Sequence, residues 1–185
     1  EGLIFPPTKY SKSRDWDGGP FERMVAANVR MPDATVGDLY AQFAANAIGA
    51  RRVSALAERY GVDVLSTAMD EMLDYSERRI RAEIRDLPNG VYTGEAVLDG
   101  DGLRDARIYI RTQVEISDEG LAISFDGTDD QVATNINCPF ASTQAAAIAV
   151  VKSVLTDPDI PFNDGVDRVI SVVAPFGSIL NPKPP

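Results

Sequence analysis

Arg107-Ile108-Tyr109-Ile110-Arg111-Thr112-Gln113-Val114-Glu115-Ile116 is the stretch that decides the fold, because apolar and polar side chains alternate along it. A period of two places alternate side chains on opposite faces of a β-strand. Ser117-Asp118-Glu119-Gly120 is typical of a turn, and the apolar parity then resumes. We therefore predict a β-hairpin with one buried face, formed by Ile108, Ile110, Val114, Ile116, Leu121 and Ile123.

The segments around this hairpin extend the predicted sheet. Residues 91–98 should form another antiparallel strand, and the mostly apolar residues 169–173 a last one. Between them, residues 143–156 are rich in alanine and apolar on most faces, which predicts a buried helix capped by Ser142 or Thr143.

The first half of the chain has helical spacing instead. Residues 21–30 predict a short helix, and two longer amphipathic helices meet at Gly61 and end before Pro88. One glycine between two long helices favours an antiparallel hairpin. Gly49 lies inside the first of them, where glycine costs about 1 kcal/mol relative to alanine and usually indicates close packing. Trp16 lies in a polar, glycine-rich stretch, and we expect it at the surface.

The sequence therefore predicts an α+β fold, with an N-terminal antiparallel helical hairpin followed by an antiparallel β-sheet with a buried alanine-rich helix. We divide it into an extended lead-in segment (1–20), a helical region (21–88) and an α+β sheet region (89–185). The chain begins with Glu1 rather than methionine and ends on the proline-rich residues 181–185, so we expect a portion of a longer subunit.

Composition excludes several classes of function. A hydrophobic content of 44% in 185 residues supports a buried core, and 28 acidic against 18 basic side chains give a net charge of −10. This charge disfavours nucleic acid and anionic membranes as partners, and no apolar run approaches the roughly 20 residues that span a bilayer. Without signal-peptide features or a second cysteine, we expect a cytoplasmic protein. Histidine is absent, so any metal would need oxygen ligands or Cys138.

The candidate site is the loop that follows the predicted hairpin. It gathers carboxylates, amides, a hydroxyl and the single thiol, and its substrate-binding candidates are Asp126, Thr128, Asp129, Asn135, Asn137 and Cys138. With the N-terminus of the next helix, these groups could hold a carbonyl or carboxylate oxygen. The alternative is an ordinary turn, since Asp-Gly and Asn are common in strand-to-helix connections. The residues alone assign no catalytic side chain.

Eight short motifs, in order along the whole chain, resemble the hydantoinase B/oxoprolinase family. They are Glu1-Gly2-Leu3-Ile4-Phe5-Pro6-Pro7-Thr8-Lys9, Ala45-Asn46-x-x-Gly49-Ala50-Arg51-Arg52, Asp74-Tyr75-Ser76-Glu77-Arg78-Arg79-x-Arg81, Leu87-Pro88-Asn89-Gly90-x-Tyr92, Phe125-x-Gly127-Thr128-Asp129-x-Gln131, Asn137-Cys138-Pro139, Asp157-Pro158-Asp159-Ile160-Pro161-x-Asn163-x-Gly165 and Pro175-x-Gly177-Ser178-x-Leu180-Asn181-Pro182.

The resemblance implies a B-type subunit that opens a cyclic amide, such as a hydantoin or 5-oxoproline, beside an ATP-binding hydantoinase A-type subunit. ATP and Mg²⁺ would belong to that partner, in a hetero-oligomer. Related acetone and acetophenone carboxylases bind a metal through histidines and aspartates in segments that precede the matched stretch. This chain lacks histidine and a Gly-x-x-x-x-Gly-Lys nucleotide loop, so we expect no metal site, no cofactor in this chain and no turnover by the fragment alone.

Two alternatives to this function stay open at this stage. The chain could be a portion of a carboxylase large subunit that acts on a ketone, or it could only scaffold a subunit and contact its partners. The family pattern as we know it does not require cysteine at position 138, which leaves the thiol without an assigned role.

Overall fold

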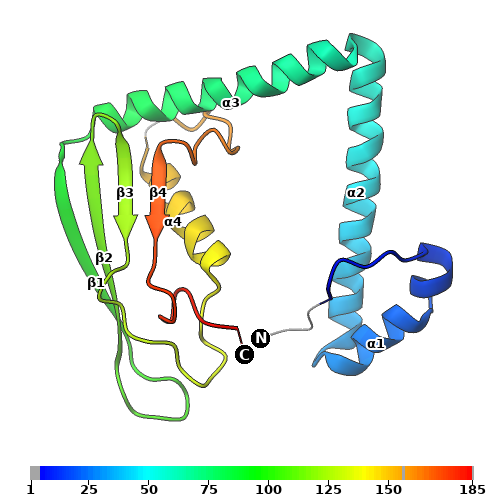
Figure 1. The fold of residues 1–185 in the computed structure, drawn as a ribbon, viewed down its shortest axis with the longest axis horizontal. Coiled ribbons are helices and arrows are strands. Elements are labelled where there is room, and N and C mark those ends of the chain that lie inside the picture. Colours follow the sequence, from blue (N-terminus) through cyan, green and yellow to red (C-terminus); the bar gives the residue numbers. More distant parts are fainter. Residues whose placement is uncertain (1–4, 156, 185) are drawn as a thin grey trace. The chain divides into compact units, whose positions relative to one another are not determined.

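The computed structural model describes residues 5–155 and 157–184, which form two compact units, Glu1–Leu65 and Ser66–Pro185 (Figure 1). The first unit contains a π-helical turn and two helices: Lys12–Trp16, α1 (Pro20–Asn28) and α2 (Pro32–Tyr60). Helix α3 (Val62–Arg85) begins in the first unit and continues in the second. The second unit adds β1 (Gly90–Leu98), β2 (Ile108–Ser117), β3 (Gly120–Ser124), α4 (Phe140–Val154) and β4 (Ile170–Val173). Within the described ranges, no helix is both long and apolar enough to cross a membrane.

An aromatic cluster organises the first unit. Trp16 is only 5% exposed and packs edge-on against Tyr40 and Phe43, with ring centroids 5.9 and 5.0 Å apart. The surface position expected for Trp16 is therefore wrong. The π-helical turn also interrupts the lead-in that we expected to be extended, and it brings the indole against α2. Residues 1–4 of that lead-in lie outside the described residues.

The two long helices of the sequence prediction are present. α2 starts with proline at its first position, where the missing N–H removes no helical hydrogen bond, and it ends at Gly61, whose φ of +87° suits glycine. Helix α2 lies in the first unit, whereas α3 belongs to the second unit from Ser66 onward. Because each unit is described by itself, the antiparallel packing of a helical hairpin stays a prediction.

The hairpin predicted from the alternating stretch is confirmed. β2 and β3 pair antiparallel, with Val114 opposite Ile123 and Ile116 opposite Leu121, as the shared parity requires. β1 pairs antiparallel with β2 along all of its nine residues. The α+β fold class is thus confirmed, and the sheet order is β1-β2-β3-β4.

The expectation of a wholly antiparallel sheet is wrong at its last strand. β4 pairs parallel with β3, for example Ile123 with Val172. The intervening segment carries α4 across one face of the sheet and returns the chain in the same direction, which is how parallel neighbours are connected (Figure 1).

The core of the second unit lies between α4, the sheet and α3. Its buried members are Ile80, Ile84, Leu121, Ile123, Ile148, Val151, Ile160, Val166, Val169, Ile170 and Val172. Helix α4 is buried along one side only, because the described chain packs a single layer against it, and Val150 and Val154 are 63% and 65% exposed. It begins at Phe140 after Pro139, so neither Ser142 nor Thr143 caps it. Thr143 Oγ1 instead donates to the Leu180 carbonyl at 2.8 Å.

Candidate functional site

The loop after β3 is bonded to β2 by its own side chains. Thr128 Oγ1 accepts from the Arg111 N–H and donates to the Arg111 carbonyl, both at 3.0 Å. The Asp129 carboxylate accepts from the Tyr109 N–H at 2.8 Å, and the Asp129 N–H donates to the Tyr109 carbonyl at 2.9 Å. Thr128 and Asp129 therefore continue the edge of β2 that β3 no longer covers. Thr128 is buried, as such a role requires.

Asn137 closes the second half of this loop. Its carboxamide oxygen accepts from the Val132 N–H at 2.9 Å, and its nitrogen donates to the carbonyls of Val132 and Thr134 at 2.7 and 3.0 Å. Backbone bonds then tie the loop to the C-terminal segment, including Cys138 N–H to the Ile179 carbonyl at 2.7 Å. The Asn137 side-chain amide, which the sequence suggested as a ligand-binding group, is therefore hydrogen-bonded to the backbone of its own loop.

Arg111 is the functional candidate that the sequence prediction missed. Its Nε donates to Glu95 Oε2 at 2.9 Å and its Nη1 to the Gly127 carbonyl at 2.5 Å, while Nη1 lies 3.6 Å from Asp129 Oδ1. The guanidinium also lies over the Tyr109 ring, 5.0 Å from its centroid. In the alternating pattern Arg111 was one polar residue among several. Its pairing with Glu95 depends on the β1–β2 register, which a single strand pattern does not contain.

The remaining predicted residues lie in different places. Asp126 lines a shallow hollow of about 490 Å³ with Glu95, Arg111 and Gln113, on the sheet face opposite α4. Cys138 lines an apolar groove of about 390 Å³ between β2 and α4. Asn135 is exposed in the loop between them. The structure therefore brings Asp126, Thr128 and Asp129 around Arg111, and it does not bring Cys138 to the same surface.

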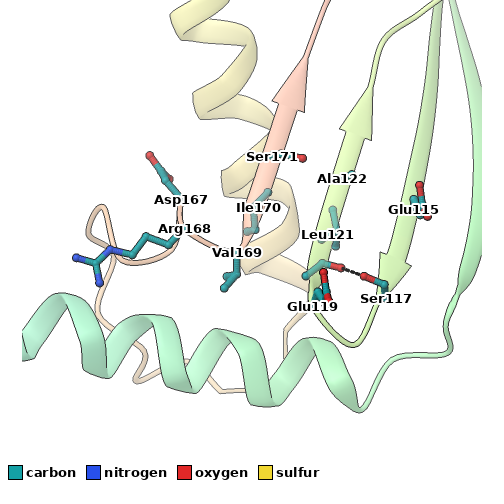
Figure 2. Close-up of a pocket in the computed structure, with 11 residues that line it drawn as sticks. Glu115, Ser117, Glu119, Leu121, Ala122, Asp167, Arg168, Val169, Ile170 and Ser171 are labelled. Carbon is teal, nitrogen blue, oxygen red and sulfur yellow. Dashed lines mark hydrogen bonds between the residues drawn. The ribbon is translucent and has the colours of Figure 1, made fainter.

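A second polar hollow, of about 380 Å³, lies where the β2–β3 hairpin meets the start of β4, and none of the predicted residues lines it (Figure 2). Figure 2 shows Arg168 pointing away from Ser117 and Glu119. It bonds Asp74 Oδ1 at 2.6 Å and Glu77 Oε2 at 3.2 Å on α3. Together with Arg81, the larger influence, Arg168 lowers the pKa of the Glu77 carboxyl below its usual value. Arg168 thus fastens α3 to this edge of the sheet.

The chemistry of these surfaces is polar binding and positioning. In the described part of the chain, no group of three or more His, Cys, Asp or Glu side chains is placed to hold a metal ion. Around Arg111, one cation lies between two carboxylates beside the exposed Asp126. That arrangement can orient a polar ligand, but it contains no nucleophile paired with a base.

The model of the hydantoinase B/oxoprolinase family matches residues 1–185, so the chain belongs to this family and the resemblance stated above is confirmed. It is 39% identical over 198 aligned residues to the B-type subunit of a putative D-/L-hydantoinase of Pseudomonas sp., covering 98% of the chain and 32% of the relative. An uncharacterized protein of Methanocaldococcus jannaschii is 35% identical over 185 residues, again 32% of its own length.

Two solved structures also match the chain. The ATP-dependent caprolactamase from Pseudomonas jessenii superposes on the whole chain with a TM-score of 0.77 and 31% identity, over 32% of that chain. An acetone carboxylase in its nucleotide-free structure matches 70% of the chain with a TM-score of 0.61 and 17% identity, which shows a shared fold. The chain therefore spans about one third of the length of the relatives that it matches most fully.

Proposed function

We propose that the protein to which this chain belongs is the B-type subunit of an ATP-dependent cyclic-amide hydrolase. One observation carries the proposal: the entire chain aligns, at 31% identity and a TM-score of 0.77, with an ATP-dependent caprolactamase. Relatives named as a hydantoinase, a caprolactamase and a 5-oxoprolinase support the same substrate class, a ring closed by an amide bond. In this proposal ATP and Mg²⁺ are bound by an A-type partner, and any divalent metal is bound by segments outside these 185 residues.

Within such a subunit, this chain supplies a frame rather than the reacting groups. Thr128, Asp129 and Asn137 fix the loop through the backbone bonds described above, and Arg111 ties the loop to β1. They are positioning residues in this proposal. Asp126 is exposed beside Arg111 and is the loop side chain best placed to touch a ligand.

A ketone carboxylase is the second candidate, and the shared fold with acetone carboxylase supports it. At 17% identity that likeness carries the fold alone, so the hydrolase is favoured. The internal hydrogen bonds of Thr128 and Asn137 support a third possibility, that this chain only scaffolds the subunit. The variants described below test that role in the same complex as the activity.

The deciding experiment uses the full-length subunit with its ATP-binding partner. Hydantoin, 5-oxoproline and caprolactam are supplied with ATP, and acetone and acetophenone with ATP and bicarbonate, while ring opening and ADP release are followed. We expect substrate-dependent ADP release with at least one cyclic amide. Turnover only with a ketone and bicarbonate would replace the hydrolase proposal with the carboxylase.

Two variants of the same complex separate positioning from contact. Asp126→Asn changes the charge of an exposed side chain, so a change in KM or kcat at unchanged Tm indicates contact with the ligand. Asn137→Leu removes three loop bonds, and we expect it to lower stability by about 2 kcal/mol while turnover per folded enzyme is preserved. A stable Asn137→Leu complex with a greatly reduced kcat would instead assign the amide to the chemical step.

A further inference from the structure

Strand β1 is an open edge of the sheet in the described chain. It is the first of four strands, and its nine residues, Gly90–Leu98, pair with β2 in an unbroken register. All of its residues after Gly90 are exposed, including Val91 at 59% and Val97 at 42%. It contains neither lysine nor proline and has no bulge, which are the features that protect natural edge strands from pairing.

The hydrogen bonds of β2 show which groups of β1 face outward. Tyr109 and Arg111 direct their N–H and C=O groups to the loop residues Asp129 and Thr128, on the β3 side. Because these directions alternate along a strand, the even-numbered residues of β2 face β1. In the observed register they pair with the even-numbered residues of β1. The N–H and C=O groups of Val91, Thr93, Glu95 and Val97 therefore point away from the sheet.

The opposite edge has a different character. β4 has only four residues, Ile170–Val173; Asp167 and Arg168 precede it, and Pro175 follows two residues after its end. Short length, charge and proline are common protections of an edge. The sheet is thus closed to further pairing at β4 and open at β1.

The apolar layer also continues toward β1. Tyr92 and Ala96 lie opposite Val114 and Ile110, two residues that line the apolar groove beside α4. Tyr92 is 46% exposed, and Val150 of α4, which also lines the groove, is 63% exposed. On the other face the carboxylate of Glu95 is paired with Arg111, so the edge presents no unpaired charge to a neighbouring strand.

We propose that in the whole protein β1 binds an additional β-strand, contributed by the same polypeptide outside these 185 residues. Its chemistry follows from β1: apolar side chains toward the groove, and no acidic residue opposite Glu95. The matched relatives are about three times as long as this chain, which leaves ample polypeptide for such a strand. A second copy is disfavoured by the net charge of −10, because like charges on two copies repel each other.

Amide hydrogen exchange on the full-length protein tests the proposal directly. If β1 is paired on both sides, all of its amides are protected, about twice as many as in an open edge, where only the even-numbered residues bond β2. Fast exchange at Val91, Thr93, Glu95 and Val97 would overturn the proposal. So would protection that disappears on dilution, which indicates a second copy, or protection that needs the ATP-binding partner.

A pair of variants gives a second, independent measurement. Thr93→Pro removes an N–H that makes no bond to β2, whereas Thr93→Ala keeps that N–H and removes the same side chain. With an added strand in place, we expect the full-length Thr93→Pro protein to melt several degrees below Thr93→Ala. Equal melting temperatures of the two variants would show that no strand pairs with this edge.

Discussion

Helices α2 and α3 are consecutive and long, but of the two only α3 contains buried residues in the described chain. None of the 29 residues of α2 is buried, and Ile48, Val53 and Leu56 are more than 40% exposed. The C-terminal half of α3 buries Ser76, Ile80 and Ile84 completely. Both helices carry apolar residues along their length, and their burial differs with what packs against each helix.

Residues 160–166 pack against α3 and form part of its cover. Asn163 Nδ2 donates to Ser76 Oγ at 2.9 Å, and Ser76 Oγ donates to the Pro161 carbonyl at 3.2 Å. Ile160 and Val166 join Ile80 and Ile84 in the core. An apolar stripe thus predicts that a helix needs a neighbour, but it does not predict which element becomes that neighbour.

The largest expected effect is the removal of a covered side chain. Ile80→Ala should destabilise the protein by about 4 kcal/mol, since the side chain is 0% exposed and its loss leaves a cavity. Leu56→Ala on α2 is the matched control and should cost less than about 1 kcal/mol. Chemical denaturation measures both. A large loss for Leu56→Ala would break the comparison by showing that α2 is covered in the whole protein.

Two glycines sharpen the same contrast. A Cβ at Gly165 would lie 2.1 Å from the Leu73 carbonyl oxygen of α3, so Gly165→Ala should cost about 3 kcal/mol. A Cβ at Gly49 of α2 meets no atom within 4 Å, and Gly49→Ala should raise stability by up to about 1 kcal/mol through helix propensity. The midpoints of denaturation should therefore move in opposite directions. A destabilising Gly49→Ala would support the close packing that the sequence indicated.

A smaller effect is expected from the polar bond that joins α3 to its cover. Asn163→Ala should cost about 2 kcal/mol, because it removes the donor to Ser76 Oγ and leaves the Gly165 N–H without its acceptor. Asn89→Ala is the control, since Asn89 is exposed and bonds Asp118 at the surface. Its stability should stay within about 0.5 kcal/mol of the parent. Equal losses of stability in the two variants would mean that the bond between Asn163 and Ser76 does not stabilise the packing of residues 160–166 against α3.

The smallest effect concerns pH. Arg81 and Arg168 lower the pKa of Glu77 on α3 below its usual value of 4.5. A lowered folded-state pKa gives stability that is present above the unfolded pKa and is lost as pH falls through the folded one. Glu77→Gln should therefore flatten the acid side of the plot of Tm against pH and leave its slope near neutral pH unchanged. An unchanged acid limb would show that these ion pairs contribute no measurable stability.

The candidate site shows the same contrast: local sequence patterns identify the loop, but the tertiary structure decides what its side chains contact. The sequence identified the loop and its small polar residues, because Asp-Gly and Asn have strong local preferences. It could not assign their partners: Thr128 meets Arg111, seventeen residues earlier, only because β2 extends beyond the end of β3. Substrate binding by Asp126, Thr128, Asp129, Asn135, Asn137 and Cys138 stays a prediction.

By itself, the sequence determined the elements whose signal is local. The period of two from Ile108 to Phe125 set the hairpin and its register, since a slip by one residue would turn every apolar side chain to the other face. Tertiary structure decided the rest. β4 runs parallel to β3 because α4 packs across the sheet, and Trp16 is buried because a helical turn places it against Tyr40 and Phe43. Such outcomes depend on contacts between distant residues, and no local period encodes them.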